Sequence, residues 1–153
     1  MLSISSSAFA ANDFFPKKYT CDGEDVNPPL EITGVPTNAR SLALIVDDPD
    51  APGGTWTHWT AWNISPETHE IPERSIPSGA VEGMTSFGKP GYGGPCPPSG
   101  VHRYFFKLFA LDTIPDLPAG ATRGELEEAM RGNISGGEKC IDTGTRRIII
   151  IFI

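Results

Sequence analysis

The fold of this chain is decided by the stretch His102-Arg103-Tyr104-Phe105-Phe106-Lys107-Leu108-Phe109-Ala110-Leu111. In extended backbone, successive side chains point to opposite faces, so the even and odd positions of this stretch form separate faces. Both faces are largely apolar, and both carry aromatic residues, which are enriched in strands. We therefore expect residues 102–111 to form a central strand of a sheet, covered on both faces.

Shorter runs earlier in the chain predict further strands. Ser41 to Val46 is an apolar run between polar residues, which is typical of a buried strand. Residues 26–32 contain Asn27-Pro28-Pro29 and are expected to be extended. Residues 56–64 alternate, which predicts one face with Trp56, His58, Thr60, Trp62 and Ile64 and another with Thr57, Trp59, Ala61 and Asn63.

One helix and one long loop are also predicted. Thr122-Arg123-Gly124-Glu125 matches a capping box, Leu126, Ala129 and Met130 share one helical face, and Gly132 is a natural stop. Residues 83–100 contain too many glycines and prolines for regular structure. A loop of that length more often carries a function than a simple connection.

Composition favours a β-rich protein whose loops carry the function. The 153 residues predict one domain, 1–153, and 17 glycines and 15 prolines predict many turns. The formal charge of −7 argues against nucleic acid or an anionic membrane surface as a partner. Without a convincing targeting segment or a run of membrane-spanning length, we expect a cytoplasmic protein with no stable membrane insertion.

The three cysteines, Cys21, Cys96 and Cys140, cannot all pair within one chain. None belongs to a CxxC motif, which argues against a zinc site. We expect reduced thiols, as is usual in the cytosol. A Cys21–Cys96 bridge is the alternative, because both residues lie in turn-like segments.

Two polar clusters follow the predicted strands: Asp48-Pro49-Asp50-Ala51-Pro52 with Trp56-Thr57-His58, and Gly93-Gly94-Pro95-Cys96-Pro97-Pro98-Ser99-Gly100-Val101 leading to His102-Arg103-Tyr104. In extended backbone, Asp48 and Asp50 point the same way, as do His102 and Tyr104. Strand ends gather at one edge of a sheet, so these groups could converge there. Imidazole, phenol and backbone amide donors suit phosphate or carboxylate oxygens, and proline rings and Trp56 could wall such a pocket.

Taken singly, each feature has an ordinary structural explanation. Asp48-Pro49-Asp50 is typical of a turn that ends a strand, and Asp48 could form a structural salt bridge with Arg103 or another cation. Tyr104 could simply anchor a loop. Only the combined spacing of these residues favours a binding site.

These motifs resemble the phosphatidylethanolamine-binding proteins, also called Raf kinase inhibitor proteins. Tyr19-Thr20-Cys21-Asp22-Gly23 and Pro28-Pro29-Leu30 are similar to the bacterial and archaeal branch, and the resemblance runs from about Ser7 to about Asn133. It implies a mainly β fold, with two antiparallel sheets in a Greek-key, sandwich-like arrangement and one or two peripheral helices. A cis bond between Ala51 and Pro52 would suit a tight turn beside the site.

The resemblance also implies a pocket for the phosphate of phosphorylethanolamine-like groups and other small anions, with no metal, no other cofactor and no catalytic residue. It implies as well a protein partner that is a kinase or a protease. The residues implied to line the pocket are Asp48, Asp50, Trp56, His58, Gly94, Pro95, His102 and Tyr104.

The tail, residues 133–153, departs from the family pattern. Ser135-Gly136-Gly137-Glu138-Lys139 would break a helix, and Thr143-Gly144-Thr145 is followed by Arg146 rather than tyrosine. The run Ile148 to Ile153 must be a buried strand, be covered by a partner, or favour aggregation. Edge pairing between two copies would give a homodimer.

Three functions are therefore carried forward. Non-catalytic anion binding is favoured. A hydrolase using the Asp/His cluster is the alternative, although Ser99 and Cys96, the nucleophiles nearest His102 in sequence, lie in a loop. A zinc or iron site made from Asp48, Asp50, His58 and His102 is the third.

Overall fold

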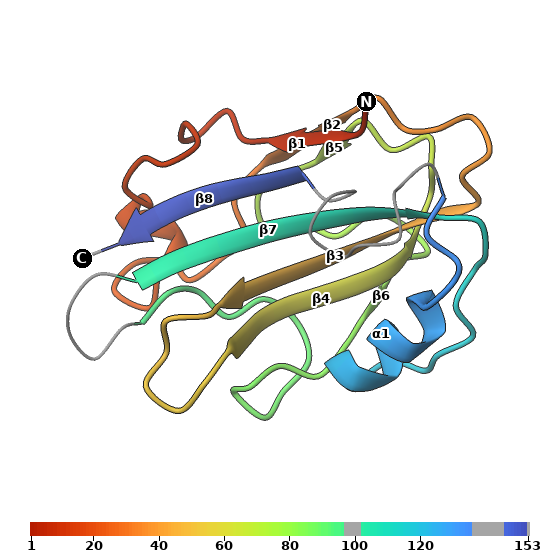
Figure 1. Ribbon diagram of the computed structural model, residues 1–153. Helices are drawn as coiled ribbons and strands as arrows, with labels where there is room; N and C mark the ends of the chain where they lie inside the picture. The colour runs from red at the N-terminus through yellow and green to blue at the C-terminus, as the bar shows by residue number, and fades with distance from the viewer. Residues whose placement is uncertain (97–101, 136–145, 153) are drawn as a thin grey trace.

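The computed structural model describes residues 1–96, 102–135 and 146–152, the last of these as backbone only (Figure 1). Within these residues the chain forms two antiparallel sheets, as expected. The small sheet has the order β1 (Ser3–Ser5), β2 (Leu30–Thr33), β5 (Glu70–Ile71). The large sheet has the order β6 (Val81–Glu82), β4 (Trp56–Ile64), β3 (Ser41–Asp48), β7 (His102–Leu111), β8 (Arg146–Phe152).

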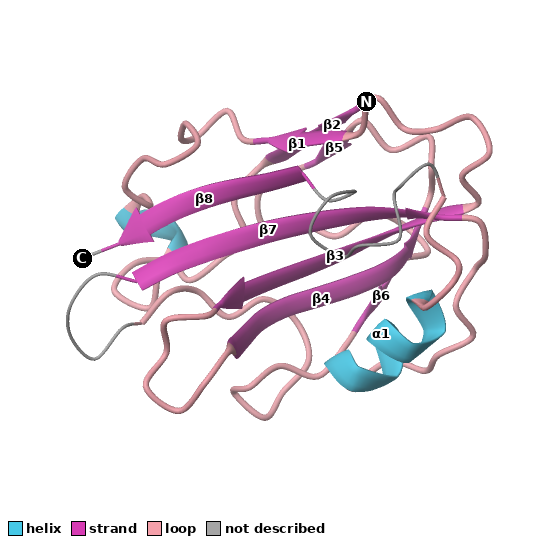
Figure 2. Ribbon diagram, viewed as in Figure 1, coloured by secondary structure: helices cyan, strands magenta, loops and turns pink. Residues whose placement is uncertain are grey.

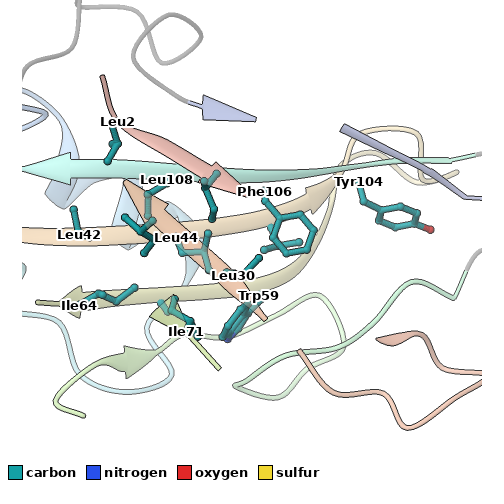
Figure 3. Close-up of a cluster of buried hydrophobic side chains, with 14 of the residues drawn as sticks. Leu2, Leu30, Leu42, Leu44, Trp59, Ile64, Ile71, Tyr104, Phe106 and Leu108 are labelled. Atoms are coloured by element: carbon teal, nitrogen blue, oxygen red, sulfur yellow. The ribbon is translucent and has the colours of Figure 1, made fainter. Parts of the chain in front are cut away.

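Strand β7 lies inside the large sheet, between β3 and β8, which confirms the prediction for residues 102–111. Its even positions face the small sheet, where Phe106 and Leu108 pack with Leu30 and Leu44 in the main core (Figure 3). Its odd positions include Phe109, which belongs to a second core on the other face. The two apolar faces thus serve two separate cores.

The helices lie outside the sheets: α1 (Arg123–Met130) and the short 3-10 helix η1 (Lys17–Tyr19) (Figure 2). The predicted capping box is present, with Glu125 N–H donating to Thr122 Oγ1 and Thr122 N–H donating to Glu125 Oε2. Leu126 and Met130 are buried in the second core, and Ala129 is half-buried. In the part of the chain described, no helix is long and apolar enough to cross a membrane.

The predicted faces of β4 were wrong, because the strand carries two register shifts against β3. Asp47 pairs with Thr57 but Val46 pairs with Trp59, so His58 is an extra residue. A second extra residue lies between Ala61 and Ile64, where Asn63 has a φ of 55°. Such bulges re-aim side chains, and Trp59 accordingly lies in the main core while Trp62 lies in the second one.

The isoleucine run forms β8, which pairs antiparallel with β7 from His102↔Phe152 to Leu108↔Arg146. Residues 148–152 therefore lie in a strand at the edge of the large sheet, and the covering of this edge by a partner stays a prediction. Residues 136–145, including most of the predicted helix-breaking segment, lie outside the described residues. The described residues contain no cis peptide bond, so the Ala51–Pro52 bond is trans. The prediction of a cis bond at this turn is therefore wrong.

Candidate functional site

A cavity of about 220 Å³ opens where the end of β3, the start of β4 and the start of β7 meet. Figure 2 shows these strand ends gathered with several loops at one end of the large sheet. Antiparallel pairing explains the convergence, because Asp48 lies opposite Trp56 while Asp47 lies opposite Phe105. The cavity is lined by Asp48, Ala51, Pro52, Trp56, His58, Phe87, Cys96, His102 and Tyr104.

The polar centre of the cavity is a buried pair made by Asp48 and His102. His102 Nδ1 lies 2.6 Å from Asp48 Oδ2, and the backbone N–H of Asp50 donates to Asp48 Oδ1 at 2.8 Å. Both carboxylate oxygens are therefore satisfied, as a buried carboxylate requires. The carboxylate also directs the Nδ1 proton of His102 toward itself, so the Nε2 edge remains for a ligand.

His58 presents an acceptor to the same cavity. Its Nδ1 lies 2.7 Å from the carbonyl oxygen of Gly93, and since a carbonyl only accepts, Nδ1 carries the proton. Burial lowers the pKa of His58, and the bond to Gly93 and the nearby Asp48 oppose this only in part. His58 is therefore neutral at pH 7, with a lone pair on Nε2.

Tyr104 lies between the two imidazoles. Its ring centroid is 5.3 Å from that of His58, edge to face, and 6.5 Å from that of His102, nearly parallel. Burial raises the pKa of Tyr104, and the charges of Asp48 and Asp50 raise it further. The phenol therefore keeps its proton at physiological pH and can donate it in a hydrogen bond.

An aromatic pair forms one wall. The Phe87 ring contacts Trp56 and His58 edge to face, with centroids 5.4 Å apart in each case. Sequence reasoning missed Phe87 as a wall residue, because it lies in the 83–100 loop, whose path no periodicity predicts. The described part of this loop supplies Phe87 and Cys96 to the cavity lining, and a functional role for the loop stays a prediction.

Three of the predicted site residues do not line the cavity. Asp50 accepts hydrogen bonds from the guanidinium and the backbone N–H of Arg103, each at 2.9 Å. The bond from the Arg103 side chain lowers the pKa of Asp50 to about 2. Arg103 thus pairs with Asp50 rather than Asp48. Asp50 contacts the site through the hydrogen bond that its backbone N–H donates to Asp48 Oδ1.

Gly94 and Pro95, the other two, belong to the segment that leads to the cavity-lining Cys96. The amide of Gly94 donates to Asp25 Oδ1 at 2.7 Å, and the carbonyl of Pro95 accepts from the Cys21 amide at 3.1 Å. A Cβ at Gly94 would lie 2.2 Å from the carbonyl oxygen of Tyr19. Only glycine fits this close backbone approach.

Cys21 and Cys96 form a disulfide. The expectation of reduced thiols is therefore wrong for these two residues, and the alternative is correct. Seventy-five positions separate the cysteines in sequence, so no local pattern indicated their approach. Because its sulfur is bonded, Cys96 has no thiolate to act as a nucleophile.

A metal site finds no support in the described residues. Nowhere in residues 1–96 and 102–135 do three or more His, Cys, Asp or Glu side chains form a group that could hold a metal. Asp48 is instead engaged by His102, and Asp50 by Arg103.

Fold and site together define a class: a two-sheet β protein with a cavity of carboxylate, imidazole and phenol groups at one sheet end. A family model described as "Phosphatidylethanolamine-binding protein" matches residues 5–141, and the chain belongs to this family.

Relatives in other organisms agree with this assignment. The chain is 49% identical over 145 residues to a UPF0098 protein of Methanothermobacter thermautotrophicus, covering 92% of this chain and 96% of the relative. It is 55% identical over 138 residues to a UPF0098 protein of Pyrococcus horikoshii, covering 84% and 69%. These names state no activity.

Two crystal structures have the same fold. A phosphatidylethanolamine-binding protein homologue of Chlamydia trachomatis has a TM-score of 0.90 at 37% identity, covering 99% of this chain and 97% of that one. E. coli YbcL, described as a member of the mammalian family, has a TM-score of 0.86 at 29% identity, with the same coverage.

Proposed function

We propose that the protein binds small anions, of the class of phosphorylated headgroups such as phosphorylethanolamine, in the cavity around Asp48 and His102. The observation that carries the proposal is one cavity that combines a buried Asp48–His102 pair with the neutral imidazole of His58 and the phenol of Tyr104. This set offers both donors and an acceptor to a phosphate monoester.

Charge balance decides which ligand suits the cavity. When His102 is protonated, its charge offsets that of Asp48, and its Nε2–H is directed away from the carboxylate toward a ligand oxygen. Tyr104 supplies a second donor. The Nε2 lone pair of His58 can accept the remaining proton of a phosphate monoanion, while Trp56 and Phe87 provide contact for an organic substituent.

The proposal is binding without turnover. The hydrolase alternative needs a nucleophile beside a base, and Cys96 is excluded from that role by its disulfide. Ser99 lies outside the described residues. Neither histidine of the cavity contacts a serine or threonine hydroxyl among the described residues, as nucleophilic catalysis would favour.

A protein partner, a kinase or a protease, is part of the proposal. Trp56 and Phe87 are 38% and 39% exposed beside the cavity, and aromatic residues are enriched at protein interfaces.

Two further expectations are kept as proposals: a cytoplasmic location, which cell fractionation tests, and a homodimer through β8, which sedimentation tests. Because disulfides are rare in the cytosol, the Cys21–Cys96 bond favours an oxidising compartment instead, and cell fractionation decides between the two locations.

Thermal unfolding with inorganic phosphate and phosphorylethanolamine, with and without chelator, tests the binding proposal. Saturating ligand is expected to raise Tm by about 5–10 °C at a hundredfold excess over Kd. His102→Ala should abolish the rise, while His69→Ala, which changes an exposed histidine, should retain it. A Tm that no anion changes would refute the proposal, and turnover of a phosphate ester lost in His102→Ala would favour the hydrolase.

A further inference from the structure

The segment from Gly93 to Cys96, which brings Cys96 to the cavity and is called the supporting wall below, is held on two sides. On the cavity side, Gly93 N–H donates to the His58 carbonyl at 2.9 Å, and the Gly93 carbonyl accepts from His58 Nδ1 at 2.7 Å. On the other side, the wall rests on residues 19–25, through the Gly94–Asp25 and Cys21–Pro95 hydrogen bonds. The Cys21–Cys96 disulfide is the covalent connection on that second side.

The disulfide differs from the other contacts because it joins the ligand cavity to a distant segment. Cys96 lines the cavity, whereas Cys21 belongs to the supporting segment behind it. Each hydrogen bond of the wall can exchange for one with water at small net cost. The sulfur–sulfur bond opens only by reduction, so it holds the wall against residues 19–25 while it exists.

The wall in turn orients His58. The Gly93 carbonyl keeps the imidazole proton on Nδ1 and leaves the Nε2 lone pair for the ligand. A wall that moved away from β4 would remove this carbonyl, and the proton could then occupy either nitrogen. The geometry of the wall therefore decides whether His58 can accept from a ligand.

We propose that the Cys21–Cys96 disulfide is a positioning element of the anion cavity, so that reduction of the disulfide weakens ligand binding. The inference rests on the proposed function. A dithiol reductant supplies two electrons and two protons, the Sγ–Sγ bond becomes two thiols, and the reductant becomes a disulfide. The reduced wall samples other arrangements, and the apparent Kd rises by the reciprocal of the fraction that remains competent.

Calorimetric titration with phosphorylethanolamine tests the coupling. All proteins carry Cys140→Ser, which leaves the disulfide intact and removes the third cysteine. The oxidised form is compared with the dithiothreitol-reduced form, with Cys21→Ser, which leaves the Cys96 side chain in the wall, and with reoxidised protein. We expect Kd to rise about tenfold or more in the reduced and Cys21→Ser forms and to recover on reoxidation.

Nitrogen-15 NMR of the His58 ring gives a readout that needs no ligand. Oxidised protein should show the proton on Nδ1, whereas the reduced and Cys21→Ser forms should show a mixture of both tautomers. Amide spectra report whether each form is folded, and if Cys21→Ser does not fold, the comparison of oxidised and reduced Cys140→Ser protein decides the test.

The two proposals fail in different ways. If oxidised protein binds and the reduced form binds equally well, the positioning role is overturned and the binding function stands. If oxidised protein does not bind phosphorylethanolamine or phosphate, the binding function fails. In that case, identical His58 spectra in both redox forms overturn the positioning role, and different spectra support it.

Discussion

His58 shows how one side chain acquires its chemistry from its surroundings. As an exposed residue it would gain a proton near pH 6.5, but burial lowers its pKa in the folded chain. The Gly93 carbonyl then selects the Nδ1–H tautomer. The sequence places an imidazole here, and the packing turns it into a neutral acceptor.

The stability of the protein should therefore depend on pH through His58. Its folded pKa is lowered, so the unfolded chain binds the proton first as the pH falls below about 6.5. Stability should decrease with falling pH, by at most about 1.4 kcal/mol per pH unit, until the folded pKa is reached. His58→Asn, which can still donate to Gly93, should lose this dependence in urea unfolding between pH 7.5 and pH 5.

His69→Asn is the matched control for this titration, because His69 is exposed. It should keep the wild-type dependence on pH. A His58→Asn protein whose unfolding free energy falls with pH as steeply as that of the wild type would contradict the assignment of His58 as a buried neutral group.

In strand β4, the alternation of side chains in the sequence does not predict which face each residue occupies. Strict alternation would put His58 and Trp59 on opposite faces, but the first bulge turns both toward the small-sheet side. The second bulge, at Asn63, shifts the pairing of β4 with β3 by one more residue before Ile64. His58 lines the cavity together with Trp56, as alternation predicts, and the bulge brings Trp59 to the same side.

The bulge at Asn63 predicts an unusual response to substitution. Its φ of 55° lies in the left-handed region, and its Oδ1 is buried without a partner among the described residues. Asn63→Gly should be at least as stable as the wild type, since glycine adopts this conformation freely. Asn63→Val should lose about 1–2 kcal/mol. Urea unfolding measures both, and equal stability of the two variants would contradict the bulge.

Over the whole molecule, helix α1 is fastened to the large sheet by a buried charge network on the face opposite the cavity. Asp47 is 1% exposed, and its Oδ2 accepts from Arg123 of α1 at 2.7 Å and from Lys107 of β7 at 2.8 Å. Asp47 and Asp48 are adjacent, yet one serves the helix and the other serves the cavity, because neighbours in a strand face opposite ways.

Removing Arg123 should therefore weaken the fold without weakening anion binding. Breaking a buried pair costs roughly 3–5 kcal/mol, and Arg123→Met should cost somewhat less, about 2 kcal/mol, because Lys107 remains beside Asp47. Arg131→Met, at a side chain that is 76% exposed and pairs with the exposed Glu128, should change stability by less than about 0.5 kcal/mol. Chemical unfolding and phosphorylethanolamine titration measure the two effects, and a stable Arg123→Met protein would contradict the role of the network.

Much of this molecule follows from local pattern. The apolar faces of residues 102–111 predict the central strand, and the capping box before Glu125 predicts the helix, because both depend on contacts within a few residues of sequence. The motifs around Asp48, His58 and His102 likewise indicated five of the cavity-lining residues: Asp48, Trp56, His58, His102 and Tyr104.

Other features were decided only in three dimensions. Four features depend on contacts between segments that are distant in sequence. They are the Cys21–Cys96 disulfide, the contact of Phe87 with the cavity, the bulges of β4 and the ion pair of Asp50 with Arg103. Periodicity states which way a side chain points from its own backbone. Periodicity does not predict which distant loop will pack against that side chain. At this cavity, the loop that contains Gly93 packs against His58, and its carbonyl decides which ring nitrogen carries the proton.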